Sequence, residues 1–275
     1  MRARVVLFPL LALTLAGLSL SQNPQEFKHH LLAIGEVKGF QHDSVSHALA
    51  TIDKLGRESG LWDTYIRTDS QLLTKEKIPA GNAKNLTYFD AVLFYTTGEL
   101  DMTDQQKKDL LSFVHDDGKG FIGVHSATDT FYKWPEYGEM IGGYFDQHPW
   151  GVFKAPVIVE RPDFPAMKAF PKSFVIEDEI YQIKDWSRDK VDVLARLDAS
   201  KLDLSNPRVH RTDKDFAVAW AKTYGNGRVF YSTFGHRDQV WQQPDIQQMY
   251  LEAVKWAMRL TDAKIAPHGP VTPTE

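Results

Sequence analysis

The chain has 275 residues, of which 43% are hydrophobic and 25% are charged, a composition that supports one sizeable globular core in one domain or two. Acidic residues outnumber basic ones by four, which argues against nucleic acid and anionic membranes as partners. The sequence has no cysteine, and this excludes disulfides and a cysteine nucleophile.

The first predicted element is a signal peptide over residues 1–21. Arg2 and Arg4 precede an apolar run at 5–18, and small residues lie where they are expected before a cut after Ser21. The alternative is a membrane anchor, because a run of about 20 apolar residues can span a bilayer. We expect cleavage, which makes the protein secreted or periplasmic, leaves it without a membrane contact and raises the acidic excess to six.

The first half of the mature chain alternates strands with helices. Apolar runs predict buried strands at 31–34, 64–67, 88–95 and 120–124. Apolar residues at helical spacing predict a helix at 44–55, and a capping box of Thr103 and Gln106 predicts a second helix that ends near Gly118. This alternation predicts a parallel sheet with right-handed crossovers.

The second half is less regular and is interpreted as an elaboration of the same domain. Short strands are predicted at 156–159, 174–176 and 191–194. Strands at 217–220 and 228–233 flank a Tyr-Gly-Asn-Gly turn, which predicts an antiparallel hairpin because Asn and Gly tolerate positive φ. A closing helix follows from Asp245, and the Pro-rich tail at 262–275 is expected to pack loosely.

Several motifs, taken together and in order between about His30 and Leu260, resemble the ThuA-like family of trehalose utilisation proteins. They lie at 39–43 (GFQHD), 123–127 (GVHSA), 142–148 (GGYFDQH), 178–181 (DEIY), 225–231 (GNGRVFY) and 235–236 (GH). The resemblance implies a ThuA-like domain over 28–261 within the class I glutamine amidotransferase-like superfamily. It implies an α/β, flavodoxin-like, mostly parallel sheet with helices on both faces, and a link to bacterial carbohydrate metabolism.

The strand at 120–124 is followed by small residues and Thr128, which predicts a sharp turn that lifts one side chain above the sheet edge. Glutamine amidotransferases carry a cysteine at the matching position, where this chain has His125, so glutaminase activity is not expected. His125 is suited to be a general base, a proton donor or a metal ligand, with a structural role as the alternative. Ser126 is the second choice as a nucleophile, but it lacks a Gly-x-Ser-x-Gly frame.

Two further histidines are predicted at the ends of strands. His42 lies in the loop after the first strand, where open α/β sheets place binding groups, although Asp43 or Ser44 in that loop can equally cap the next helix. His236 follows the last strand. His125 and His236 are predicted to be catalytic, and His42 is predicted to bind substrate.

The remaining candidates are His148 and the segment at 178–181. A loop histidine is usually solvated, and the family motif is what marks His148 as a substrate-binding candidate. Strand alternation sends Glu179 and Tyr181 to one face and Asp178 to the other. Glu179 is therefore the favoured catalytic carboxylate, Tyr181 a substrate contact, and Asp178 a substrate contact or an orienting or capping group.

Histidines together with a carboxylate suit zinc, manganese or iron. The local spacing is not diagnostic, because the chain has no His-Glu-x-x-His motif, so a divalent metal stays an open alternative. Aromatic rings near the motifs suit the faces of sugars, although core or lid packing is their commoner role; they are Phe131, Tyr132, Trp134, Trp150 and Trp241.

Two functions follow from these observations. The first is an enzyme that acts on a small-molecule carbohydrate, a sugar or an oxidised sugar glycoside, by histidine and carboxylate acid-base chemistry, for example by taking a proton beside a keto group. The second is a noncatalytic sugar-binding or assembly module that kept the fold without the cysteine. A secreted serine hydrolase is less favoured, because the motif frame around Ser126 is absent.

Overall fold

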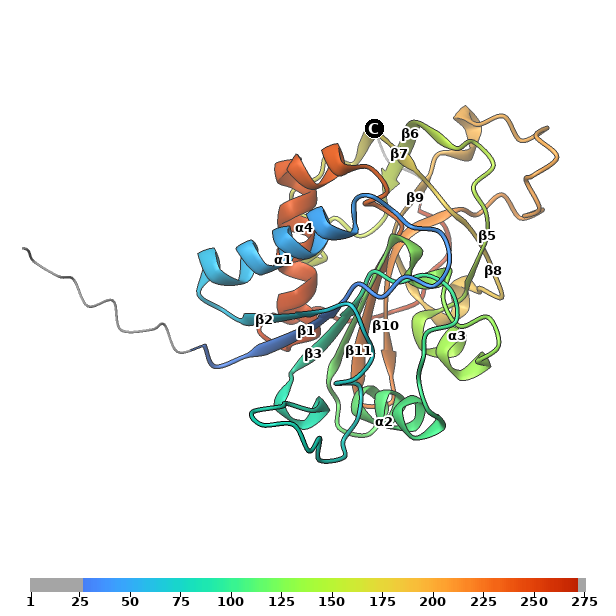
Figure 1. The fold of residues 1–275 in the computed structure, drawn as a ribbon. Helices are drawn as coiled ribbons and strands as arrows, with labels where there is room; N and C mark the ends of the chain where they lie inside the picture. Colours follow the sequence, from blue (N-terminus) through green and yellow to red (C-terminus); the bar gives the residue numbers. More distant parts are fainter. Residues whose placement is uncertain (1–26, 272–275) are drawn as a thin grey trace, which may run out of the picture.

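The computed structural model describes residues 27–271, so the predicted signal peptide lies outside the described residues. The centre is a nine-stranded sheet in the order β2-β1-β3-β4-β11-β10-β9-β6-β7, and a smaller sheet pairs β5 with β8 (Figure 1). The strands are β1 (His30–Ile34), β2 (Asp63–Arg67), β3 (Ala91–Phe94), β4 (Gly120–Val124), β5 (Tyr144–Gln147), β6 (Val152–Val159), β7 (Ser173–Glu179), β8 (Gln182–Lys184), β9 (Asp192–Leu197), β10 (Ala217–Tyr224) and β11 (Gly227–Ser232). The α-helices are α1 (Val45–Ser59), α2 (Asp104–His115), α3 (Pro135–Ile141) and α4 (Pro244–Ala257).

The large sheet has a parallel half and an antiparallel half. The parallel half, β2-β1-β3-β4-β11, has the strand order of flavodoxin-like folds, which bind ligands beyond the carboxyl ends of their strands. The antiparallel half, β10-β9-β6-β7, joins it through the predicted hairpin between β10 and β11. The predicted fold class is therefore confirmed, and the strands of the second half extend the same sheet.

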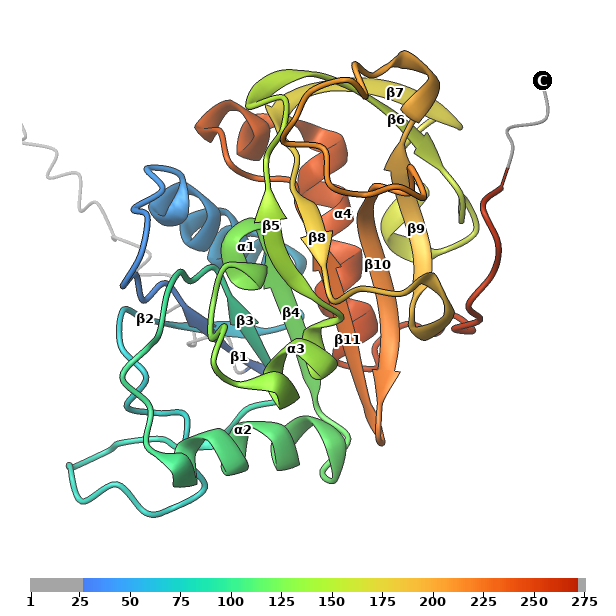
Figure 2. The same cartoon turned by 90° about the vertical axis from the view of Figure 1, so that its right-hand side faces the viewer.

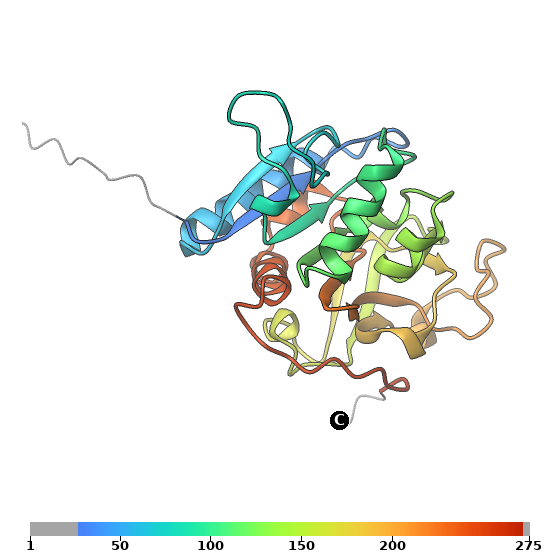
Figure 3. The same cartoon turned by 90° about the horizontal axis from the view of Figure 1, so that it is seen from below.

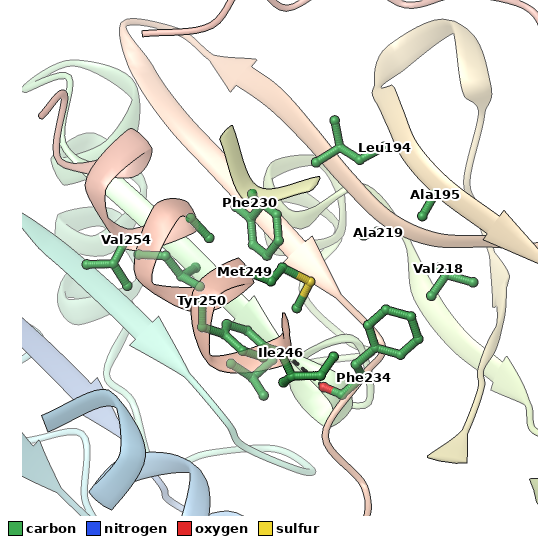
Figure 4. Packing of buried hydrophobic residues seen from close by; sticks show 14 of the residues in the cluster. Leu194, Ala195, Val218, Ala219, Phe230, Phe234, Ile246, Met249, Tyr250 and Val254 are labelled. Atoms are coloured by element: carbon green, nitrogen blue, oxygen red, sulfur yellow. Dashed lines mark hydrogen bonds between the residues drawn. The ribbon is translucent and has the colours of Figure 1, made fainter. Parts of the chain in front are cut away.

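Helices cover both faces of the sheet, as predicted. α1 and α4 lie on one face, and α2 and α3 lie on the other (Figures 1 and 3). On the first face Met249 and Tyr250 of α4 pack against Phe230 and Leu194 of the sheet (Figure 4). Each such side chain contributes on the order of 1.5–3 kcal/mol by leaving water, so this packing fixes the strand ends that carry the candidate site.

Two local differences from the predicted elements have a clear cause. The strand predicted at 88–95 is shorter, because Leu86–Tyr88 forms a 3-10 turn that the Asn85 side chain caps by accepting from the Thr87 amide. The second difference is that strands β6 and β7 are longer than predicted, because they pair with each other from Val152 to Ile158. The predicted capping box, in contrast, is present at the start of α2.

The start of the tail is better anchored than its composition indicates. The Ala266 amide donates to Asp192, and His268 Nε2 lies 3.1 Å from the Val193 carbonyl oxygen, so residues 262–271 include contacts with β9. Between residues 27 and 271, none of the helices combines the length and the apolar character that a membrane span needs.

Candidate functional site

His125 stands in a sharp turn at the end of β4, as predicted. Its φ of 42° is in the left-handed region, where a residue other than glycine is strained by about 1–3 kcal/mol, and such strain gathers at functional sites. Its ring Nδ1 lies 2.6 Å from the Thr233 carbonyl oxygen. A carbonyl only accepts, so Nδ1–H is the donor, and the lone pair of the neutral ring is on Nε2.

Three predicted catalytic side chains converge beyond the carboxyl ends of the strands. His236 Nδ1 lies 3.2 Å from His125 Nε2 and 3.2 Å from Glu179 Oε2, and His125 Nε2 lies 3.6 Å from the same oxygen. Glu179 reaches this edge because β7 runs in the same direction as β4 and β11. The structure therefore brings His125, Glu179 and His236 together from distant parts of the chain.

The predicted substrate contacts surround this centre. His42 is buried, with its ring centroid 4.9 Å from that of His125 and 5.2 Å from that of His236. The Tyr181 ring lies 4.3 Å from His125, and its hydroxyl is 3.4 Å from His42 Nε2. The strand β5 runs beside β8 (Figure 2), and His148, which follows β5, is partly exposed and places Nδ1 3.5 Å from Glu179 Oε1.

Asp178 points away from this centre and makes the orienting contacts predicted as one of its roles. Its carboxylate accepts from the Gly235 amide at 2.7 Å and from the Arg237 amide at 3.1 Å. These amides flank His236, so the buried carboxylate fixes the backbone on both sides of that residue. The alternative capping role of Ser44 is not observed: its hydroxyl donates to the Gly235 carbonyl and leaves the α1 terminus uncapped by a side chain.

The charges of the cluster are strongly coupled. Burial alone raises the pKa of Glu179, but the contacts with His125 and His236 outweigh burial and hold that pKa well below its usual range. Burial lowers the pKa of His236, and the contact with Glu179 outweighs it and raises this pKa. Burial, followed by the charges of His125 and His236, lowers the pKa of His42 to about 3. Glu179 is therefore anionic and His42 is a neutral imidazole near pH 7.

A pocket of about 240 Å³ opens beside the cluster, with His42 and His236 in its wall. This volume is below the range of about 300–1,000 Å³ for drug-sized ligands, which indicates a small ligand or one unit of a larger one. Phe40, which is 64% exposed, stands at this pocket with its ring 4.8 Å from that of His42.

Sequence reasoning missed Phe40, Arg237, Asp129 and the Thr233 carbonyl. The first two are pocket-lining neighbours of predicted histidines. Burial raises the pKa of Asp129, and Tyr132 donates to it at 2.5 Å. Proximity to the motif histidines was a usable signal for Phe40 and Arg237, whereas a backbone carbonyl carries no residue signal.

The aromatic residues divide between the core and the surface. Phe131, Trp134 and Trp241 are buried in the two core clusters, as the packing alternative predicts. Tyr132 is 39% exposed, and Trp150 is partly buried against Phe153. Within residues 27–271, the residue types that bind transition metals also gather here: one ligand atom from each of His42, His125, Glu179 and His236 lies within 4.8 Å of all the others.

Solved structures with a similar fold include two ThuA-like proteins. That of Bacteroides uniformis ATCC 8492 matches with a TM-score of 0.69 and 21% identity, over 86% of this chain and 93% of that chain. That of Parabacteroides merdae ATCC 43184 matches with a TM-score of 0.65 and 16% identity, over 87% and 92%. The cytoplasmic protein STM1381 of Salmonella typhimurium LT2 matches with a TM-score of 0.52 and 13% identity, over 82% and 98%. At these identities the likeness concerns the fold alone.

The sequence comparisons are consistent with this likeness. No curated protein is significantly similar in sequence to this chain. Residues 30–257, which are most of the chain, match the sequence model of the family described as ThuA, trehalose utilisation. The chain therefore belongs to the ThuA family.

Proposed function

We propose that this protein is an enzyme of carbohydrate metabolism that acts on a sugar or an oxidised sugar glycoside. Glu179 and the histidines around it carry the protons of the reaction. The observation that carries the proposal is the buried Glu179 carboxylate, which meets His125 and His236 at Oε2 and His148 at Oε1. The family description, trehalose utilisation, supports a sugar as the substrate.

The arrangement suits proton abstraction beside a keto group. A proton on the carbon next to a carbonyl is acidic, because the electron pair that it leaves behind is shared with the carbonyl oxygen. One group must take that proton while another donates to the oxygen. His236 lies in the pocket wall, and Glu179 joins it to the partly exposed His148, so the network can pass a proton between the pocket and His148.

The pocket also fits a sugar. Its polar wall includes His42, Asp43 and Arg237, which can bind hydroxyl groups, and Phe40 offers an exposed ring to the apolar face of a pyranose. The small volume favours one sugar unit in the pocket, with the remainder of a glycoside outside it.

The test is exchange and turnover with trehalose and with trehalose oxidised to a ketone on one ring. In deuterium oxide, we expect the wild type to exchange the proton beside the ketone, seen by NMR, or to release a product, seen by mass spectrometry. Glu179→Gln should lower this rate by about 10²–10⁴-fold, the usual contribution of acid-base groups.

The matched control is His115→Gln, because His115 is half exposed and lies beside the β10–β11 turn, at the opposite end of β11 from His236. It should keep the wild-type rate. Saturable binding of these sugars without exchange or product would overturn the proposal in favour of a noncatalytic binding module.

We also propose that the protein is exported, because residues 1–21 have the pattern of a signal peptide. N-terminal sequencing of protein from the culture medium or the periplasm should begin at Gln22. Recovery of the intact N-terminus from the membrane fraction would instead support the anchor alternative.

A further inference from the structure

We infer that His42, His125, Glu179 and His236 bind one divalent transition-metal cation of the Zn²⁺, Mn²⁺ or Fe²⁺ type beside the pocket. The inference deepens the proposed function, and rests on it only for the use of the ion in a sugar reaction. The binding itself is argued from the geometry, orientation and chemistry of these four side chains.

The first observation is the triangle formed by three ligand atoms. His125 Nε2, His236 Nδ1 and Glu179 Oε2 are separated by 3.2, 3.2 and 3.6 Å. Nitrogen and oxygen ligands lie about 2.0–2.2 Å from zinc, so neighbouring ligands of a tetrahedral ion are roughly 3.3–3.6 Å apart. A point about 2.1 Å from all three atoms exists just outside their plane. The side chains are therefore already spaced as the ligands of one ion.

The second observation is the orientation of the histidines. Metal-bound histidines usually donate their other N–H to a carbonyl or carboxylate, which fixes the tautomer. His125 does this at the Thr233 carbonyl, which leaves the Nε2 lone pair facing Glu179 and His236. Asp178 holds the backbone amides on both sides of His236. The supports that a metal site needs are thus present around its ligands.

The third observation is the choice of side chains. The three imidazole rings of His42, His125 and His236 meet with centroids 4.9–5.2 Å apart, against one carboxylate. Among the described residues, Nδ1 of the buried His42 has no hydrogen-bond partner. A single cation can be coordinated by the nitrogen lone pairs of all three converging imidazoles. Three nitrogen donors favour a first-row transition metal over Mg²⁺ and Ca²⁺, which prefer oxygen ligands.

The position of the cluster also fits a catalytic ion. His42 and His236 line the pocket, so an ion between them can be reached by a ligand that enters it. Four protein ligands fill a tetrahedral shell, so a ligand from the pocket would take a fifth position, an expansion that zinc undergoes in catalytic sites. Within the cluster His148 meets Glu179 at Oε1 and lies outside the ligand set. With the ion bound, the lone pairs of His125 and His236 are used as ligands, so the proton-carrying role in the proposed function passes to His148.

The test begins with the full chain purified without chelators, whose metal content is measured by elemental analysis. The stripped protein is then titrated with Zn²⁺ and with Co²⁺, whose visible absorption reports its ligand geometry. We expect one equivalent per chain and no competition from Mg²⁺ or Ca²⁺. His42→Ala and His236→Ala should each weaken binding by more than about 10–100-fold, the loss that outer-shell changes cause. The remote control His115→Gln should bind like the wild type.

Folded wild-type protein that binds neither Zn²⁺ nor Co²⁺ would overturn the site, and this outcome needs no variant to fold. Binding that persists unchanged in both alanine variants would also overturn it, because the ion would then lie elsewhere. Stoichiometric binding without turnover of the keto sugar would overturn the proposed function and leave the metal site standing. Turnover of the keto sugar by protein that binds no metal would overturn the metal site and leave the proposed function standing.

Discussion

The neighbouring strands β6 and β7 lead to two buried glutamates with opposite surroundings. Glu160 follows β6 and is held by Arg188 at 2.7 Å and by Arg196 at 2.5 Å, with His268 farther off at 3.7 Å. Glu179 ends β7 and meets three histidines, His125, His148 and His236, at 3.2–3.6 Å. Because the strands are antiparallel, the two carboxylates lie at opposite ends of the strand pair.

The difference lies in what each partner can do. Arginine stays charged at any ordinary pH and forms fixed pairs with carboxylates, so the two arginine pairs of Glu160 can only hold the structure together. Histidine gains and loses a proton near neutral pH and binds metals, so the Glu179 cluster can take part in chemistry. Two carboxylates with similar burial thus have different uses, which the identity of their partners decides.

The largest effect on stability is expected from a change in the cluster around Glu160. Glu160→Gln removes the carboxylate that pairs with Arg196 and one of the two that pair with Arg188, which keeps Asp215 at 2.6 Å. Loss of one partner of a buried pair costs about 3–5 kcal/mol. We expect the free energy of unfolding in urea to fall by about 3 kcal/mol. Co²⁺ affinity of the folded variant should stay at the wild-type value, because Glu160 is not among the ligands.

The counterpart is Glu179→Gln, which should lose Co²⁺ affinity. If Glu160→Gln weakened Co²⁺ binding as strongly as Glu179→Gln does, the division between a structural and a chemical cluster would be wrong.

A smaller effect is expected at Asp178, which supports the second cluster without belonging to it. Asp178→Asn keeps one carbonyl oxygen but cannot accept from both the Gly235 and the Arg237 amides with a charged group. We expect Co²⁺ affinity to fall by about 10–100-fold, as for other outer-shell partners, and the free energy of unfolding to fall by about 1–3 kcal/mol. Calorimetric titration and urea unfolding measure the two effects.

The control for this variant is Asp146→Asn, because Asp146 also accepts from a neighbouring side chain, Gln182, but has no contact with the four ligands. Equal losses of Co²⁺ affinity in both variants would contradict a specific role for Asp178.

The sequence predicted much of this site, for reasons that can be stated. His42, His125 and His236 follow strands of a parallel sheet, and the ends of such strands meet at one edge. Alternation placed Glu179 and Tyr181 on the side of His125. Each of these steps needs only local periodicity and the rule for parallel strands.

Other features depend on contacts between distant segments. The convergence of Glu179 with His125 requires the antiparallel order β10-β9-β6-β7, which no local pattern specifies. The shortened strand at 88–95 reflects the competing cap of Asn85. The anchored tail depends on Asp192, which is far away in sequence. The sequence pattern does not specify which segments, far apart in the chain, pair with each other.

The smallest expected effect concerns the tail, which borders the Glu160 cluster. His268 Nε2 lies 3.1 Å from the Val193 carbonyl oxygen and 3.3 Å from the buried Asp192 carboxylate. His268→Ala removes these contacts of a partly exposed side chain, so the free energy of unfolding should fall by only about 0.5–1.5 kcal/mol, with Co²⁺ affinity unchanged. A loss as large as that of Glu160→Gln would mean that the tail, and not the arginine pairs, is the main support of this end of the sheet.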